Sequence, residues 1–179
     1  SALTTSDASA WTKAFWGFAL AGGLEPSLRV VVDQVVYSSH YLALLQASTL
    51  FGVEVVVIGA GEDGTLALDL LQDALDRPTA LVTVTHVPTS SGLVNPVAEV
   101  GAIAAAAGVP YFLDACQSVG QLPVDVGTIG CDALTATGRK WLRGPRGTGL
   151  LYLRDSFADR VEPLGIDMSS AEWIDSRTY

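Results

Sequence analysis

The amino-acid sequence predicts an α/β fold in three layers, in which a mainly parallel sheet carries helices on both faces. Two observations predict it: segments typical of strands alternate with segments typical of helices, and most of the strands are continuously apolar. Strands that helices bury on both faces have that composition, whereas a half-exposed sheet alternates apolar with polar residues. The 179 residues show neither an internal repeat nor an interdomain linker, so we expect one domain over 1–179.

The first predicted helix covers 8–21. Residues suited to an N-cap, among them Ser6 and Asp7, precede aromatic residues at helical spacing, and Gly22 follows the last of them. The next element, a strand over 28–36, contains the β-branched run that is typical of a buried strand. Runs of the same two kinds, divided by turns, predict the rest: a helix over 40–51, a strand over 53–58, a helix over 66–75, a strand over 79–87, a helix over 96–107, and strands over 109–114, 131–137 and 149–153.

Charge and apolar pattern exclude several classes of function. The formal charge of −9 repels phosphate backbones and anionic lipids, so we expect no nucleic-acid or membrane partner. No apolar run reaches the ~18 residues that a spanning helix needs, and no basic segment ahead of an apolar stretch marks a secretion signal. Cys116 and Cys131 are too few for a disulfide framework, which favours buried thiols in a reducing, cytoplasmic compartment.

The two ends of the sequence favour a fragment of a longer protein. The chain begins at Ser1 without an initiator methionine, and it stops at Tyr179. Neither end has the features of a natural terminus, so we expect that the parent protein extends further.

Polar residues follow several predicted strands, at the edge where ligands bind in sheets of this kind. They lie in four segments, 37–40, 86–91, 114–117 and 137–140. The segment Ser6-Asp7-Ala8 differs from these, because it opens a helix with no recognisable strand ahead of it. We therefore expect a ligand site at the carboxyl edge of the sheet.

Three of these polar residues have the chemistry that pyridoxal 5'-phosphate requires of a protein. Lys140 supplies an amine to form a Schiff base with the cofactor aldehyde, and Asp114 supplies a carboxylate to keep the pyridine nitrogen protonated. Gln117 is placed to donate to the phenolic oxygen of the ring. Taken singly, these residues would be a solvated charge and turn residues, and it is their combination and order that favour a cofactor site.

The cofactor phosphate needs backbone N–H groups and a positive charge. The helix that starts at Asp7 and Ala8 offers free N–H groups and the positive end of its dipole. Thr137 and Arg139 lie just ahead of Lys140 and add a hydroxyl and a fixed charge.

The motif Asp114-x-x-Gln117-Ser-Val-Gly, followed by Thr-Gly-Arg-Lys140 and a Gly-Pro-rich loop, resembles the class V aminotransferase and cysteine desulfurase-like family of fold-type I pyridoxal-phosphate enzymes. The segment from His86, which includes Thr89, is similar to the strand-to-helix segment of that family, and Thr89 falls at a cofactor-binding position. The resemblance runs from about residue 3 to 153. Within the family, the segment around Lys140 is most similar in sequence to the branch of isopenicillin-N-epimerase-like proteins and the sulfoxide lyase of ergothioneine biosynthesis.

The resemblance implies a homodimeric enzyme that acts on a small-molecule amino acid through an aldimine on Lys140. It implies carbon–sulfur β-elimination first, with a class V aminotransferase as the alternative. A non-catalytic module with the same fold is the third possibility, because the family's N-terminal segment and small C-terminal domain are both absent from this chain. That small domain usually carries the arginine that binds the substrate carboxylate.

The sequence departs from the desulfurase pattern at several positions. Thr89 stands where desulfurases usually have Asn, and Arg139 stands where a His commonly precedes the lysine. The residue that stacks on the ring is left open between Tyr37, Ser38 and His40. The catalytic cysteine of desulfurases belongs to a later region, and neither Cys116 nor Cys131 aligns with it.

Overall fold

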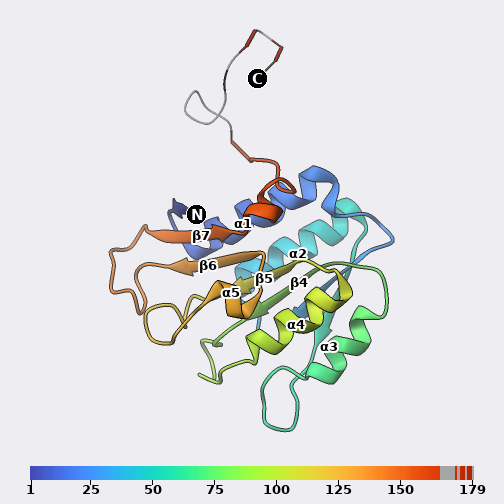
Figure 1. Cartoon of the computed structure of the whole chain (residues 1–179), viewed down its shortest axis with the longest axis vertical. Helices are drawn as coiled ribbons and strands as arrows, with labels where there is room; N and C mark the ends of the chain where they lie inside the picture. Colours follow the sequence, from blue (N-terminus) through green and yellow to red (C-terminus); the bar gives the residue numbers. More distant parts are fainter. Residues whose placement is uncertain (166–171, 173, 176, 179) are drawn as a thin grey trace.

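The computed structural model describes residues 1–165, 172, 174, 175, 177 and 178, and within them a seven-stranded sheet has the order β1-β7-β6-β5-β4-β2-β3 (Figure 1). Neighbouring strands from β2 to β6 pair in parallel, whereas β7 is antiparallel to both β6 and β1. The mainly parallel sheet predicted from the sequence is confirmed. The strands are β1 (Ala2–Thr4), β2 (Arg29–Asp33), β3 (Glu54–Ile58), β4 (Thr79–Thr85), β5 (Tyr111–Asp114), β6 (Ala133–Thr137) and β7 (Gly149–Leu153).

Helices cover both faces of the sheet, which completes the three layers (Figure 1). One face is covered by α1 (Asp7–Phe18), its continuation η1 (Ala19–Gly23), α2 (Ser38–Phe51) and α6 (Asp155–Ala158). The other face is covered by α3 (Leu68–Leu75), α4 (Val97–Ala107) and α5 (Val126–Ile129). Among the described residues no helix is both long and apolar enough to cross a membrane.

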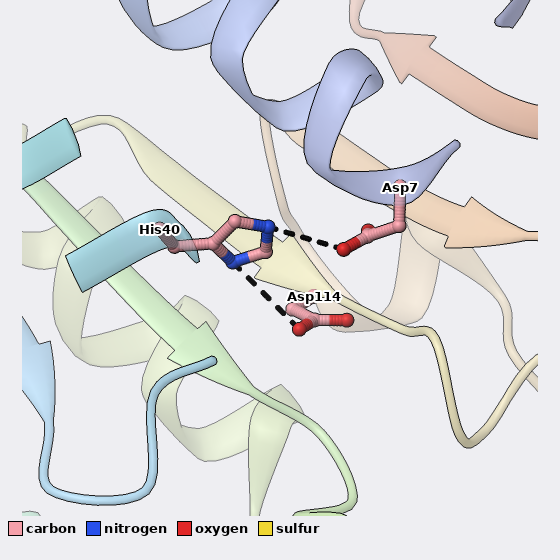
Figure 2. Close-up of side chains that lie close together, drawn as sticks. All are labelled: Asp7, His40 and Asp114. Atoms are coloured by element: carbon pink, nitrogen blue, oxygen red, sulfur yellow. Dashed lines mark ion pairs between the residues drawn. The ribbon is translucent and has the colours of Figure 1, made fainter. Parts of the chain in front are cut away.

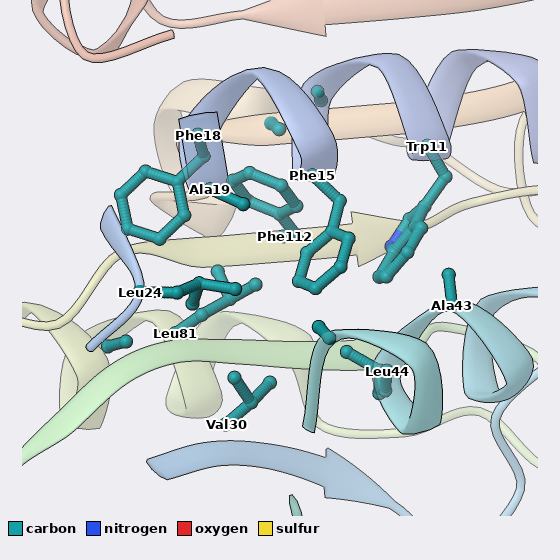
Figure 3. Close-up of a cluster of buried hydrophobic side chains, with 14 of the residues drawn as sticks. Trp11, Phe15, Phe18, Ala19, Leu24, Val30, Ala43, Leu44, Leu81 and Phe112 are labelled. Atoms are coloured by element: carbon teal, nitrogen blue, oxygen red, sulfur yellow. The ribbon is translucent and has the colours of Figure 1, made fainter. Parts of the chain in front are cut away.

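Aromatic residues of α1 form the centre of the core on the first face (Figure 3). Trp11, Phe15 and Phe18 are almost fully buried and point toward the sheet. They pack against Leu44 of α2 and Phe112 of β5. Since burying a large apolar side chain contributes about 1.5–3 kcal/mol, this layer fixes α1 firmly over the middle of the sheet.

Short elements account for most differences from the predicted pattern. The strand β1 and the helices α5 and α6 have three or four residues each, which is too short for an apolar period to show. A strand does therefore precede Ser6, contrary to our expectation, and it was missed because Ala2–Thr4 is a largely exposed edge strand. The first helix is regular only to Phe18, and a wider turn then carries the chain to Gly22, whose φ is +83°.

Close packing of α4 against α5 depends on a glycine. A Cβ atom added at Gly101 would overlap with the carbonyl oxygen of Ile129, which is backbone and cannot turn aside. We expect Gly101→Ala to lower the free energy of unfolding by about 1–3 kcal/mol, even though alanine favours a helix. Chemical denaturation measures the change. Gly59→Ala is the control, because the nearest atom to its Cβ lies 3.8 Å away. Equal stability of the two variants would contradict this account of the contact.

Candidate functional site

A cavity of about 390 Å³ opens at the carboxyl edge of the sheet. Every residue that the sequence assigned to the cofactor lines it: Asp7, Ala8, Thr89, Asp114, Gln117, Thr137, Arg139 and Lys140. The cavity also contains residues that the motifs did not single out, among them Val35, Val36, Thr85, Val87, Ser90 and Cys116. Their position at or just after the end of a strand was the one signal for them, and many residues without a role share that position.

The start of α1 faces the cavity with its backbone. Ser6 is the N-cap, in an extended conformation, and its Oγ accepts a hydrogen bond of 3.0 Å from the N–H of Ser9. The first N–H groups of a helix have no partner within it, so those of Asp7 and Ala8 suit an anion. The Asp7 carboxylate points toward His40 instead (Figure 2). Asp7 thus offers the cavity its backbone, while its side chain lies in the interior.

Asp114, at the end of the central strand β5, lies in a buried group with Asp7 and His40 (Figure 2). The His40 Nδ1 atom is 3.7 Å from Asp114 Oδ2, and the Cys116 N–H donates to Asp114 Oδ1 at 2.9 Å. Burial and the negative charge of Asp7 raise the pKa of Asp114 to about 6, against the opposing effects of His40, the Cys116 N–H and Lys140. Asp114 is therefore mostly ionised at neutral pH, as a partner of a protonated ring nitrogen must be.

Asp7 has the opposite shift. Burial would raise the pKa of its carboxyl group, but His40 outweighs this effect and the pKa lies below its ordinary value. The Nε2 atom of His40 is 3.1 Å from Asp7 Oδ2. This buried contact between the imidazole and the carboxylate is an ion pair when the imidazole is protonated.

Gln117 is held by two neighbours at the mouth of the cavity. Its Oε1 accepts a 3.0 Å hydrogen bond from the indole N–H of Trp141, and its Nε2 donates to Thr89 Oγ1 at 3.0 Å. The indole can only donate, so it fixes which side of the amide carries the NH₂ group. One hydrogen of that group is used by Thr89, and the second is free for another acceptor.

Lys140 is half-buried in the turn that follows β6. The turn is closed by a 2.7 Å hydrogen bond from the Gly144 N–H to the Gly138 carbonyl, and Arg143 within it has a φ of 56°. Arg139 is exposed and forms no ion pair within the described part of the chain. The Thr137 hydroxyl donates to the Thr148 carbonyl at 3.4 Å, and it can bind an anion only by turning that hydrogen toward it.

The three candidates for stacking on a bound ring differ in whether they line the cavity. Tyr37 and Ser38 line the cavity, and both are exposed. His40 is not among the lining residues, because it is buried against Trp11 with ring centroids 4.5 Å apart and planes at 13°. Its burial under α1 contradicts the proposal that His40 stacks on the ring, and leaves Tyr37 and Ser38.

The cavity meets the requirements of pyridoxal phosphate on three sides. Its volume lies within the usual range for cofactor pockets of about 300–1,000 Å³. A buried carboxylate, a half-buried amine and a helix N-terminus face it from three different elements. The Thr85 Oγ1 atom, which is buried and unpaired, adds a polar group beside them. Together with the parallel sheet, these features define the fold-type I class of pyridoxal-phosphate proteins.

Within that class, the chain belongs to the aminotransferase class-V family, whose model matches residues 9–175. The chain is 40% identical over 147 residues to a probable cysteine desulfurase of Methanothermobacter thermautotrophicus, covering 81% of this chain and 36% of that protein. It is 32% identical over 134 residues to the cysteine desulfurase of Escherichia coli O7:K1, covering 75% and 33%. The apo structure of a cysteine desulfurase from Thermococcus onnurineus NA1 superposes with a TM-score of 0.90 and 27% identity, over 99% of this chain and 44% of that one.

These matches confirm the family but not the branch within it. The chain spans about a third of the length of the curated relatives it matches. The match therefore says nothing about functions that the relatives carry in the two thirds of their sequence outside the aligned region.

A third buried carboxylate, Asp33, lies at the end of β2. It accepts hydrogen bonds from the N–H groups of Val35, at 3.1 Å, and Thr85. Burial raises its pKa to about 7, against the effect of these N–H groups and with a further contribution from the charge of Asp114.

The folded protein therefore keeps a proton on Asp33 that the unfolded chain, with an ordinary value of 3.8, has already lost. The contribution of Asp33 to the free energy of unfolding must therefore fall as pH rises from about 4 to about 7, by at most ~1.4 kcal/mol per pH unit. We expect Asp33→Asn to reduce this slope between about pH 6 and 7, measured by denaturation at each pH. Glu62→Gln, on an exposed turn, is the control. The same slope in Asp33→Asn as in the wild type would show that Asp33 is already ionised.

Proposed function

We propose that this chain is the cofactor-binding part of a pyridoxal-phosphate enzyme that cleaves a carbon–sulfur bond of an amino acid by β-elimination. One observation carries the proposal: Lys140, Asp114 and the N-terminus of α1 face a single cavity of suitable volume. These three groups match the aldehyde, the ring nitrogen and the phosphate of one cofactor.

The residues of the cavity divide the binding between them. When bound, pyridoxal phosphate supplies a protonated ring that accepts electrons from the substrate. Asp114 would hold the proton on the ring nitrogen, and the free hydrogen of the Gln117 amide would be donated to the phenolic oxygen. The backbone of Asp7 and Ala8, together with Thr137 and Arg139, would bind the phosphate. Tyr37 or Ser38 would be the residue that stacks on the ring.

Lys140 has two tasks in this scheme. Its Nζ atom would hold the cofactor at rest, and once a substrate amine had replaced it, the free amine would be the base that accepts the proton from the substrate's α-carbon. The bond between the β-carbon and sulfur would then break, and its electron pair would leave with the sulfur. The Lys140 side chain is half-buried in the turn after β6 and lines the same cavity as Asp114.

A sulfur-containing amino acid is favoured as the substrate because the curated relatives named above are cysteine desulfurases. Transamination is the second candidate, and the description of the matching family favours it. In accordance with the family resemblance, we also propose a homodimer, with the exposed residues Arg143 and Arg146 beside the cavity facing the second subunit.

The chain contains only two lysines, which makes the covalent assignment easy to test. We expect borohydride reduction of the loaded protein to attach the cofactor to Lys140, as located by peptide mass spectrometry. Lys140→Ala should lose this label and about 10²–10⁴-fold in turnover. Lys13→Ala is the matched control, because Lys13 is exposed on α1 and does not line the cavity. Labelling of Lys140→Ala to the wild-type extent would overturn the assignment.

The reaction type is decided by the products. With cysteine or an S-substituted cysteine, β-elimination should release pyruvate, ammonia and a sulfur species without any amino-group acceptor. Transamination would instead require a keto acid and convert it into an amino acid. Product analysis with and without added keto acid separates the two. A protein that binds the cofactor but forms neither product would support the non-catalytic module.

A further inference from the structure

His40 has no part in the function proposed above, although it occupies an unusual position. Its side chain is 1% exposed, and each of its ring nitrogens faces a carboxylate from a different element. Asp7 comes from the first turn of α1, and Asp114 comes from the end of β5 (Figure 2). We refer to Asp7, His40 and Asp114 as the buried trio.

The ring of His40 is held rigidly. It stacks on Trp11, which in turn stacks on Phe15 with ring centroids 4.7 Å apart. The indole N–H of Trp11 donates to Thr83 Oγ1 on β4 at 3.2 Å, so the stack is fixed to the sheet. The edge of Tyr37 meets the same imidazole with centroids 5.5 Å apart. The imidazole therefore has little freedom to turn away from either carboxylate.

A bridging role fits this geometry better than a metal site does. The trio has ligand atoms within 4.8 Å of one another, as a metal centre would. However, an imidazole offers one nitrogen to a metal, whereas Nε2 of His40 faces Asp7 and Nδ1 faces Asp114. A cation between the three groups would also occupy the carboxylate that faces the cavity.

We propose that His40 is a positioning residue of the cofactor site, which Asp7 anchors and which keeps Asp114 oriented and ionised toward the cavity. This inference rests on the proposed function, since it is the cofactor ring that needs the Asp114 carboxylate. It gives the Asp7 side chain a role distinct from that of its backbone. The side chains of His40 and Asp7 act through Asp114 and do not touch the cofactor.

The charged groups around the buried trio shift the pKa of Asp114 in opposite directions. Asp7 on α1 acts against the ionisation of Asp114, while His40 on α2 and Lys140 after β6 favour it. Asp114 in turn raises the pKa of Asp33 at the end of β2. The thiol of Cys116 stays protonated, because burial and the charge of Asp114 raise its pKa strongly. Replacing His40 and replacing Asp7 should therefore move the titration of Asp114 in opposite directions.

The decisive measurement follows the carboxyl carbon of Asp114 by NMR as a function of pH, in the full chain without cofactor. The signal is assigned by its loss in Asp114→Asn. In His40→Gln we expect the titration midpoint to rise by about one to three pH units, because a positive neighbour is lost. In Asp7→Asn we expect it to fall by about one pH unit, because the negative neighbour has the larger effect on Asp114.

His86→Gln is the matched control. His86 is the other histidine of the chain and is also buried, but it forms no ion pair within the described residues. Its replacement should leave the Asp114 midpoint unchanged. A midpoint that stays in place in both His40→Gln and Asp7→Asn overturns the proposal, as does one that moves in the same direction in both. Should His40→Gln not fold, His40→Asn takes its place, and an Asp114 midpoint that does not rise in that variant overturns the proposal.

The same variants loaded with pyridoxal phosphate show whether the bridge acts on the cofactor. The pH at which the bound cofactor changes its visible absorbance should rise in His40→Gln and stay unchanged in His86→Gln. Absence of cofactor binding in the wild type would contradict the proposed function, while the NMR titration would still test His40. Normal cofactor binding with an unmoved titration would contradict the bridge alone.

Discussion

The carboxylate of Asp114 lies at the end of β5, the middle strand of the sheet, where solvent scarcely reaches it. An isolated carboxylate in such a place would take up a proton, since burial costs a charged group several kcal/mol. The surrounding structure resists that outcome with a backbone N–H from Cys116, a histidine at 3.7 Å and a lysine across the cavity. The aromatic layer contributes to this arrangement, because Trp11 stacks on the histidine and holds it in place.

Parallel strands explain why residues far apart in the sequence meet here. The carboxyl ends of β2, β4, β5 and β6 point the same way, so the segments that follow them share one edge. The antiparallel pair of β1 with β7 then brings the start of α1 to that edge from the opposite end of the chain. A backbone anion site and a side-chain cofactor site are thereby placed together without any long loop.

The sequence predicted those features in which a residue with suitable chemistry lies next to a recognisable strand or helix. The apolar strands predicted the sheet, and Asp114, Gln117 and Lys140 were recognisable because a strand precedes each of them at a short distance. The trio was not predictable, because the contact of His40 with Asp7 depends on how α2 packs beneath α1. Nothing local distinguishes a histidine that stacks on a cofactor from one that stacks on a tryptophan. The N-cap pattern at Ser6 predicted the helix start but not that the Asp7 side chain would turn inward.

Asp7 has one further consequence, which concerns evolution. Its backbone faces the cavity while its carboxylate is buried beside His40, so the position is constrained from two sides. A lineage that loses the histidine leaves a buried, unpaired charge, which costs about 3–5 kcal/mol. Losing the aspartate first frees the histidine to pair with Asp114 alone. Positions 7 and 40 are therefore expected to covary among homologous sequences, although 32 residues of chain lie between them and they belong to two different helices.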